Sequence, residues 1–136
     1  MLDPSRPLQD AIIAYLKADA AVRELVGDRI YDAAPKGAEF PHASMGGVQV
    51  LPDKGDAVDG AEAFFTIDAW SQNAKGFGEV MNVARVIAAA LDDAELVLAG
   101  GVRLVDLTAE SIHTLRDPDG ITRHAVINFK ALTEPT

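Results

Sequence analysis

The sequence has 136 residues, of which 49% are apolar and 24% are charged. This balance is typical of a folded chain with one hydrophobic core, and it excludes the weakly hydrophobic, highly charged composition of disordered segments. Twenty-one acidic and twelve basic side chains give a net charge of −9, which repels phosphate and argues against tight binding of nucleic acid. The absence of cysteine excludes disulfides, thiolate zinc sites and a cysteine nucleophile.

The sequence has no apolar stretch near the ~20 residues that a membrane span needs, and its start lacks the basic and apolar regions of a signal peptide. It also has no internal repeat and no linker long enough to divide it. We therefore expect residues 1–136 to form a single domain that is made in the cytoplasm and makes no contact with a membrane.

The first part of the chain predicts two helices. Apolar side chains recur there at helical spacing, at Leu8, Ile12, Tyr15 and Leu16. Asp19 can cap a short second helix, because its carboxylate can accept hydrogen bonds from the free amides of the first turn. Gly27 can end that helix in the left-handed conformation. We expect a helix pair near residues 7–26.

The next segment predicts two strands and a polar loop. A short β-like piece at 29–32 precedes a strand at about 40–51, in which Gly46-Gly47 suggests a bulge. Residues 52–60 are rich in Asp, Gly and Pro and predict a mobile hairpin loop that orders on contact with a partner. This loop supplies the candidate partner-contact residues Asp53, Lys54, Asp56 and Asp59.

Residues 62–71 alternate most regularly along the chain. Ala63, Phe65, Ile67 and Ala69 share one face of this strand, and Phe64, Thr66, Asp68 and Trp70 share the other. After the turn at 75–78, a third helix carries a continuous apolar stripe of Val80, Val83, Ala84, Ile87 and Leu91. We expect this stripe to cover the sheet.

The last two strands, at about 102–116 and 121–133, form a hairpin across Asp117-Pro118-Asp119-Gly120. The burial pattern favours a three-residue loop with a bulge, which gives the pairs Leu115–Arg123, His113–Ala125, Ser111–Ile127, Ala109–Phe129 and Leu107–Ala131. In this register His113 and His124 lie on opposite faces of the sheet and cannot share a metal ion.

The elements follow one another in the order α-α-β-β-β-α-β-β. This order predicts the α+β class, with a mostly antiparallel sheet packed against an N-terminal helix pair and one long helix. Such a fold buries one face of the sheet and does not determine whether the other face is covered or exposed.

The sequence carries no recognisable catalytic, cofactor or metal motif. The histidines His42, His113 and His124 are dispersed, and a structural or solvent-facing role explains each. The acidic pairs Asp92-Asp93 and Asp117-x-Asp119 belong to a helix end and a turn, and Asp53, Asp56 and Asp59 lack the ligand alternation of a calcium loop. Neither a P-loop nor a dinucleotide fingerprint is present. We expect no cofactor and no enzymatic activity.

The remaining candidates are surfaces for protein partners. Phe64 and Trp70 lie on the mixed face of the strongest strand, and Ile112 and Val126 are expected on the outer face of the hairpin. Both an interface and a second layer of core explain these four residues. The residues alone therefore indicate a binding module.

Several short blocks in a fixed order resemble the small tail-completion proteins of long-tailed phages and gene transfer agents. The blocks are Leu8–Asp19, Leu25–Asp32, Phe40–Gly46, Asp68–Ser71, Leu115–Gly120 and Phe129–Glu134. The resemblance implies a tail terminator, a subunit that forms a homo-hexameric ring on the last ring of the tail-tube protein and presents a surface to the head–tail connector. It places the protein at the tail–neck junction of a virion and in the bacterial cytoplasm before assembly.

The acidic composition is compatible with a ring through which DNA passes, because an acidic inner wall would not grip phosphate. Asp53, Asp56 and Asp59 are candidates for that wall. Two alternatives stay open: another neck, head-closure or tail-tube subunit, and a small enzyme whose polar residues would converge in a pocket.

Overall fold

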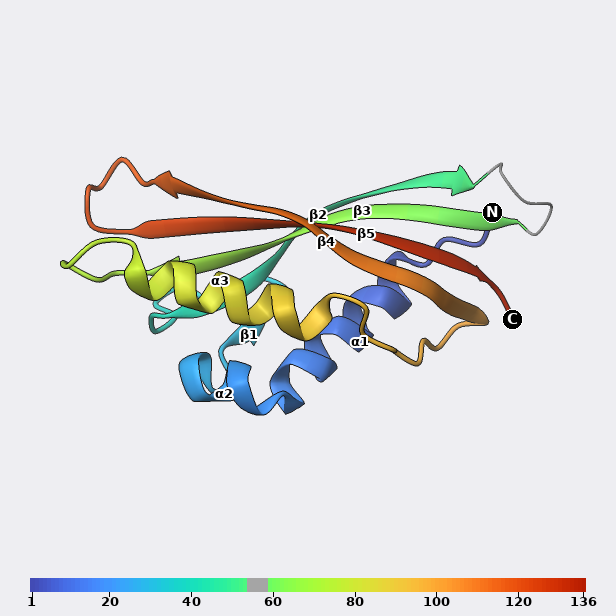
Figure 1. Ribbon diagram of the computed structural model, residues 1–136, viewed down its shortest axis with the longest axis horizontal. Helices are drawn as coiled ribbons and strands as arrows, with labels where there is room; N and C mark the ends of the chain where they lie inside the picture. Colours follow the sequence, from blue (N-terminus) through green and yellow to red (C-terminus); the bar gives the residue numbers. More distant parts are fainter. Residues whose placement is uncertain (54–58) are drawn as a thin grey trace.

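The computed structural model describes residues 1–53 and 59–136, and its element order confirms the predicted one (Figure 1). The helices are α1 (Ser5–Ala18), α2 (Ala20–Val26) and α3 (Gly78–Leu91). The strands are β1 (Ile30–Tyr31), β2 (His42–Asp53), β3 (Gly60–Ser71), β4 (Val102–Arg116) and β5 (Arg123–Pro135). The predicted α+β class is therefore confirmed.

The five strands form one sheet in the order β1-β2-β3-β5-β4. The short β1 pairs in parallel with β2, whereas the pairs β2–β3, β3–β5 and β4–β5 are antiparallel. All three helices lie on the same side of this sheet (Figure 1). The opposite side of the sheet, which we call the open face, has no covering layer among the described elements.

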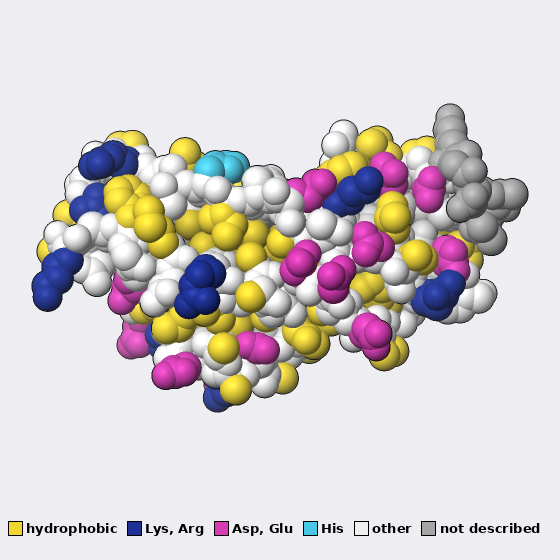
Figure 2. All heavy atoms as spheres, viewed as in Figure 1, with side chains coloured by type: hydrophobic (Ala, Val, Ile, Leu, Met, Phe, Trp, Pro, Cys, Tyr) yellow, Lys and Arg dark blue, Asp and Glu magenta, His cyan; other side chains and the backbone are white. Residues whose placement is uncertain are grey.

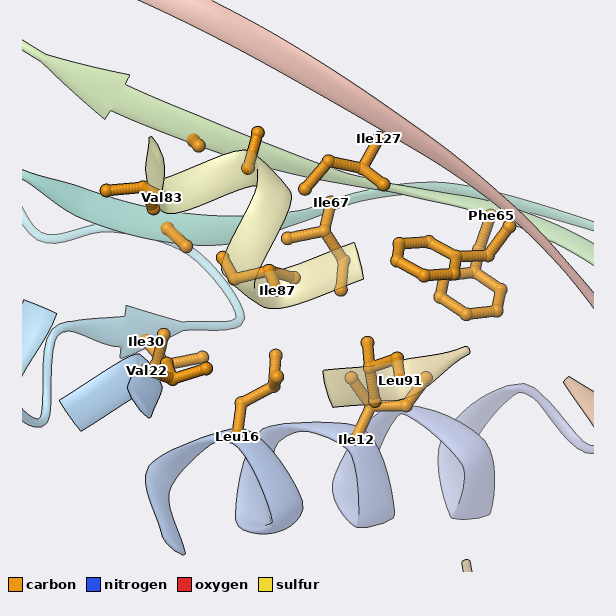
Figure 3. Close-up of a cluster of buried hydrophobic side chains, with 14 of the residues drawn as sticks. Ile12, Leu16, Val22, Ile30, Phe65, Ile67, Val83, Ile87, Leu91 and Ile127 are labelled. Carbon is orange, nitrogen blue, oxygen red and sulfur yellow. The ribbon is translucent and has the colours of Figure 1, made fainter. Parts of the chain in front are cut away.

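The core fills the space between the helices and the sheet. Side chains from α1, α3 and the central strands point toward one another there (Figure 3). The rings of Phe65 on β3 and Phe129 on β5 stack with their centroids 5.0 Å apart. The predicted stripe of α3 is buried in full: Val80, Val83, Ala84, Ile87 and Leu91. Each large aliphatic side chain in such a site stabilises the fold by about 1.5–3 kcal/mol.

The predicted Asp19 cap of α2 is confirmed, whereas Gly27 ends the helix with a ψ of −128° in place of the predicted left-handed helical conformation. The Asp19 carboxylate accepts a hydrogen bond of 3.1 Å from the Val22 amide, which satisfies one of the free donors of the first turn. Gly27 follows the helix with a φ of 57°, a conformation that other residues adopt only with strain. Both boundaries of α2 are thus set by single residues next to the helix ends.

The predicted bulge in β2 is also confirmed. The register of β2 against β3 shifts between Met45 and Val48, so that Gly46-Gly47 holds the extra residue. A Cβ atom at Gly46 would overlap with the Thr66 hydroxyl, whereas one at Gly47 would meet nothing within 4 Å. Gly46 is therefore required because the neighbouring strand approaches its backbone closely.

The predicted register of the β4–β5 hairpin is right in its middle and wrong near its turn. Two of the predicted pairs are present, Leu107–Ala131 and Ala109–Phe129. A bulge between Ala109 and Ser111 then shifts the register by one residue, so that the predicted pairs Ser111–Ile127, His113–Ala125 and Leu115–Arg123 are absent. The observed pairs are Ser111–Asn128, His113–Val126 and Leu115–His124.

The turn explains this difference, because it is longer than the predicted three residues. A hydrogen bond of 3.3 Å joins the Asp117 amide to the Thr122 carbonyl and closes the loop. Inside it, the Asp119 carboxylate accepts hydrogen bonds from the amides of Ile121 and Thr122 and from the Thr122 hydroxyl. The bulge at Glu110 absorbs the extra residue and keeps Leu107 and Ala109 directed toward the helices.

The two glycines of the β2 bulge give a matched test of this packing. We expect Gly46→Ala to lower the free energy of unfolding by about 1–3 kcal/mol, because its methyl group overlaps with Thr66. Gly47→Ala should change it by less than about 1 kcal/mol, because the space beside Gly47 is open. Denaturant unfolding of both variants measures the difference. Equal losses in the two variants would contradict the assigned role of Gly46.

Candidate functional site

The open face is built by the side chains of β3 and β5 that point away from the helices. Along both strands buried and half-buried residues alternate, and the buried ones face the helix layer. The half-buried ones form the open face: Glu62, Phe64, Thr66, Asp68 and Trp70 on β3, and His124, Val126, Asn128, Lys130 and Leu132 on β5. Polar and apolar side chains are mixed on this face, as the amphipathic pattern of β3 predicted.

Trp70 is held in a network of side chains on the open face. Its indole stacks on the His124 ring with a centroid distance of 3.8 Å and an interplanar angle of 9°. The indole N–H donates to the Ser44 hydroxyl at 3.2 Å, and His124 Nε2 lies 2.6 Å from Asp68 Oδ1. The network fixes Trp70 as part of a rigid surface without placing it in the core beneath the helices. Its predicted role in an interface stays a prediction.

Phe64 borders a shallow depression near the middle of the open face. The depression has a volume of about 350 Å³ and is lined by Gly47, Val48, Gln49, Phe64, Phe65, Thr66, Glu110, Asn128 and Phe129. The Lys130 ammonium lies 5.9 Å from the centroid of the Phe64 ring, within the range of a cation–π contact. The missing side chain at Gly47 contributes to this hollow.

The two predicted interface residues of the hairpin lie on different faces. Val126 is on the open face, opposite Asp68 of β3 and His113 of β4. Ile112 was expected beside it, but it lies opposite the buried Ile127 and therefore on the helix side. The bulge at Glu110 causes this exchange, because one extra residue reverses the direction of every later side chain in β4. Ile112 is nevertheless 44% exposed.

The expectation for two of the histidines is also corrected. His113 and His124 lie on the same face, because each is paired with a residue of the open face in the shifted register. In residues 1–53 and 59–136, no group of three or more His, Asp or Glu side chains is placed to hold a metal ion. None of the described helices is long and apolar enough to span a membrane.

Two of the four predicted loop residues, Asp53 and Asp59, lie within the described part of the chain. Asp53 ends β2 and pairs with Gly60, so the predicted β2–β3 hairpin is present. Asp59, which directly precedes β3, has a φ of 50°. Lys54 and Asp56 lie outside the described residues. The role of this loop in partner contact therefore stays a prediction.

A catalytic triad on the open face would require a hydroxyl nucleophile beside the Asp68–His124 pair. His124 has no hydroxyl group as a hydrogen-bond partner in the described part of the chain, and the Ser44 hydroxyl accepts its hydrogen bond from Trp70. The arrangement resembles a firm, amphipathic contact surface more than a reaction centre. The fold and this face together define a class of small α+β proteins whose sheet is covered by helices on one face, while the other, amphipathic face is uncovered within the described residues.

The chain belongs to the family of the tail completion protein gp17, whose family model matches residues 10–134. It is also similar to a chain in a solved structure described as the virion of a native gene transfer agent particle. The two share 31% sequence identity and superpose with a TM-score of 0.88, over 98% of this chain and 99% of the other. The protein is thus a structural protein of the phage-tail and virion kind.

A second solved chain is 14% identical, with a TM-score of 0.46 over 97% of this chain and 92% of its own length. That likeness is too distant to inform the function. No curated protein sequence matches the chain. The family resemblance that the sequence blocks indicated is confirmed by the family match and by the virion chain together.

The buried His42 at the start of β2 predicts a pH dependence of stability. Burial lowers the pKa of His42; its hydrogen bond with the Glu39 carbonyl raises the pKa, and the charge of Arg29 lowers it again. The folded protein therefore binds this proton less well than the unfolded chain, whose histidines titrate near about pH 6.5. The contribution of His42 is complete above that pH and is lost as the pH falls.

We expect the free energy of unfolding to fall between about pH 7 and pH 5 in the wild type and to fall less in His42→Gln. The exposed His113 provides the control, and His113→Gln should retain the wild-type slope. Denaturant unfolding at a series of pH values measures the three slopes. A His42→Gln slope equal to that of the wild type would contradict this role for His42.

Proposed function

We propose that this protein is a tail terminator that forms a homo-hexameric ring on the end of the tail tube. The ring stops elongation of the tube and joins the tail to the head–tail connector. The observation that carries the proposal is the full-length likeness to a chain of a gene transfer agent virion, together with the family match over residues 10–134. The proposed role is structural and involves no reaction and no cofactor.

The proposed position is the tail–neck junction, which the protein reaches from the bacterial cytoplasm during assembly. A subunit there contacts copies of itself, the tail-tube protein below and the connector above, so it needs several distinct surfaces. The open face supplies one of them, because the described part of the chain leaves it uncovered while Phe64, Trp70 and Val126 give it apolar contact area. The net charge of −9 suits a ring that DNA traverses without being held.

The main alternative is another neck, head-closure or tail-tube subunit of the same kind of particle. The alternatives differ in how they assemble. A tube protein adds subunits without limit along an axis, whereas a terminator stops at one closed ring. The mass of the assembled species and the length of the tail tubes therefore distinguish a terminator from these other subunits.

Light scattering across a concentration series, with and without polymerised tail tubes, tests the proposal. We expect a species of about six times 14.4 kDa, either in solution or bound at tube ends. Open-ended polymers would instead identify a tube subunit. A protein that stays monomeric and ignores tubes would refute the terminator role.

The open face can be tested separately through Phe64. We expect Phe64→Glu to fold normally and to lose most of its ability to cap tail tubes, because the charge lies in the depression of the face. Met81→Glu provides the control, since Met81 is an exposed apolar residue on α3 in the helix layer. Electron microscopy of tube lengths gives the readout. Normal capping by Phe64→Glu would exclude this face from the contact.

A further inference from the structure

The charges of this chain are unevenly distributed along its long axis. In Figure 2 dark blue side chains gather at the end that carries the β4–β5 turn, while magenta side chains gather over the other half. The chain as a whole is acidic, with a net charge of −9. A basic end is therefore a departure from the average composition and points to an electrostatic role.

We call the basic end the hairpin-end patch and define it by Lys75, Leu115, Arg116, Ile121 and Arg123. The guanidinium groups of Arg116 and Arg123 lie 5.4 and 5.1 Å from the centre of the Phe77 ring, which holds them side by side. Among the described residues, none of the three cationic members forms a salt bridge. Leu115 and Ile121 add apolar area and are 47% and 58% exposed.

The two acids nearest to this patch, Asp117 and Asp119, offset part of its charge, although neither forms a salt bridge with it within the described residues. The carboxylate of Asp117 accepts the Asp119 amide, and that of Asp119 accepts three hydrogen bonds from Ile121 and Thr122. Hydrogen bonds from Thr122 and Ile121, together with the nearby charge of Arg123, lower the pKa of the Asp119 carboxyl. Three cations therefore stand against two carboxylates, and this end keeps a net positive charge. The strand that carries the patch projects beyond the core, because β4 is exposed from Glu110 to Arg116 on both of its faces.

The acidic counterpart lies along the first half of β4. A groove of about 380 Å³ is lined by residues 93–96 of the connection after α3 and by residues 103–107 of β4. The groove carries three carboxylates, Asp93, Glu95 and Asp106, and none of them forms a salt bridge within the described ranges. Its one basic residue, Arg103, is already paired with Glu134. We call this feature the acidic groove.

Exposed apolar side chains border the acidic groove as well. Val97, next to the residues that line it, is 95% exposed, and Val105 on β4 is 51% exposed. Exposed apolar side chains that lie together, unlike single ones, are typical of a contact surface. The groove thus offers negative charge with apolar neighbours, and the hairpin-end patch offers positive charge with apolar neighbours.

We propose that the hairpin-end patch of one copy docks into the acidic groove of the next copy. The two surfaces differ and both belong to every chain, so the contact is head-to-tail and can close a ring. Opposite charges select the orientation of the contact and speed its formation, and exclusion of water from the apolar residues holds it. Only the number of copies in the ring rests on the proposed function.

A charge-swap experiment tests the contact. The patch variant is Lys75→Glu with Arg116→Glu, and the groove variant is Glu95→Lys with Asp106→Lys. The control, Arg6→Glu with Lys17→Glu, makes the same charge change on α1 as the patch variant does at the hairpin end. Circular dichroism melting verifies that each variant folds. Light scattering then measures assembly, with tail tubes added if the wild-type ring forms only at tube ends.

We expect each variant alone to need at least about a ten-fold higher concentration to assemble than wild type or control, because like charges then meet in the contact. An equimolar mixture of the two variants should recover ring assembly, since every contact in an alternating ring again joins opposite charges. High salt should also raise the concentration at which the wild-type protein assembles, because salt screens the opposite charges in the contact.

Three results would overturn the inference. Rings formed by both folded variants at wild-type concentrations would refute the contact and leave the terminator role intact. A mixture that recovers only species of two copies would show a two-fold contact in place of a head-to-tail one. Wild-type protein that stays monomeric with and without tubes would refute the terminator role and the contact together.

Discussion

The packing of α3 against one face of β3 and β5, with α1 packed against α3 in turn, is the constraint on which the remaining structure depends. These two strands lie at the centre of the sheet, and their buried residues, among them Phe65, Ile67, Ile127 and Phe129, form the floor of the core. Strand alternation then assigns the intervening residues to the open face. Because no described element covers that face, its polar groups are satisfied by neighbours in the sheet, as in the Trp70, His124 and Asp68 network.

Bulges adjust this regular alternation at the places where the surface matters. The bulge at Gly46-Gly47 lets Thr66 approach the backbone of β2 and opens the depression beside Phe64. The bulge at Glu110 reverses the direction of the later residues of β4, while Leu107 and Ala109 before it stay paired with Ala131 and Phe129. A single inserted residue thus separates a strand into a half that stabilises the fold and a half that is free to contact a neighbour.

Membership of the tail completion family gives these surfaces a context. A protein that is built into a virion particle must fold alone and then present matched surfaces to identical and different neighbours. The open face and the two oppositely charged regions of β4 are separate parts of the same sheet, so one rigid element orients all of them. This arrangement lets a small domain hold several contacts at fixed angles, which the proposed closed ring requires.

The sequence by itself determined the helix pair, the α3 stripe, the bulge in β2 and most of the sheet, because each depends on local side-chain chemistry or on a regular period. Its ordered blocks also indicated the family. It did not determine the register near the β4–β5 turn, the face of Ile112 or the shared face of His113 and His124, because those depend on how Asp119 closes the turn. Only the tertiary structure brought residues 93–96 against 103–107 to form the acidic groove, because the irregular connection between α3 and β4 leaves no periodic signal in the sequence.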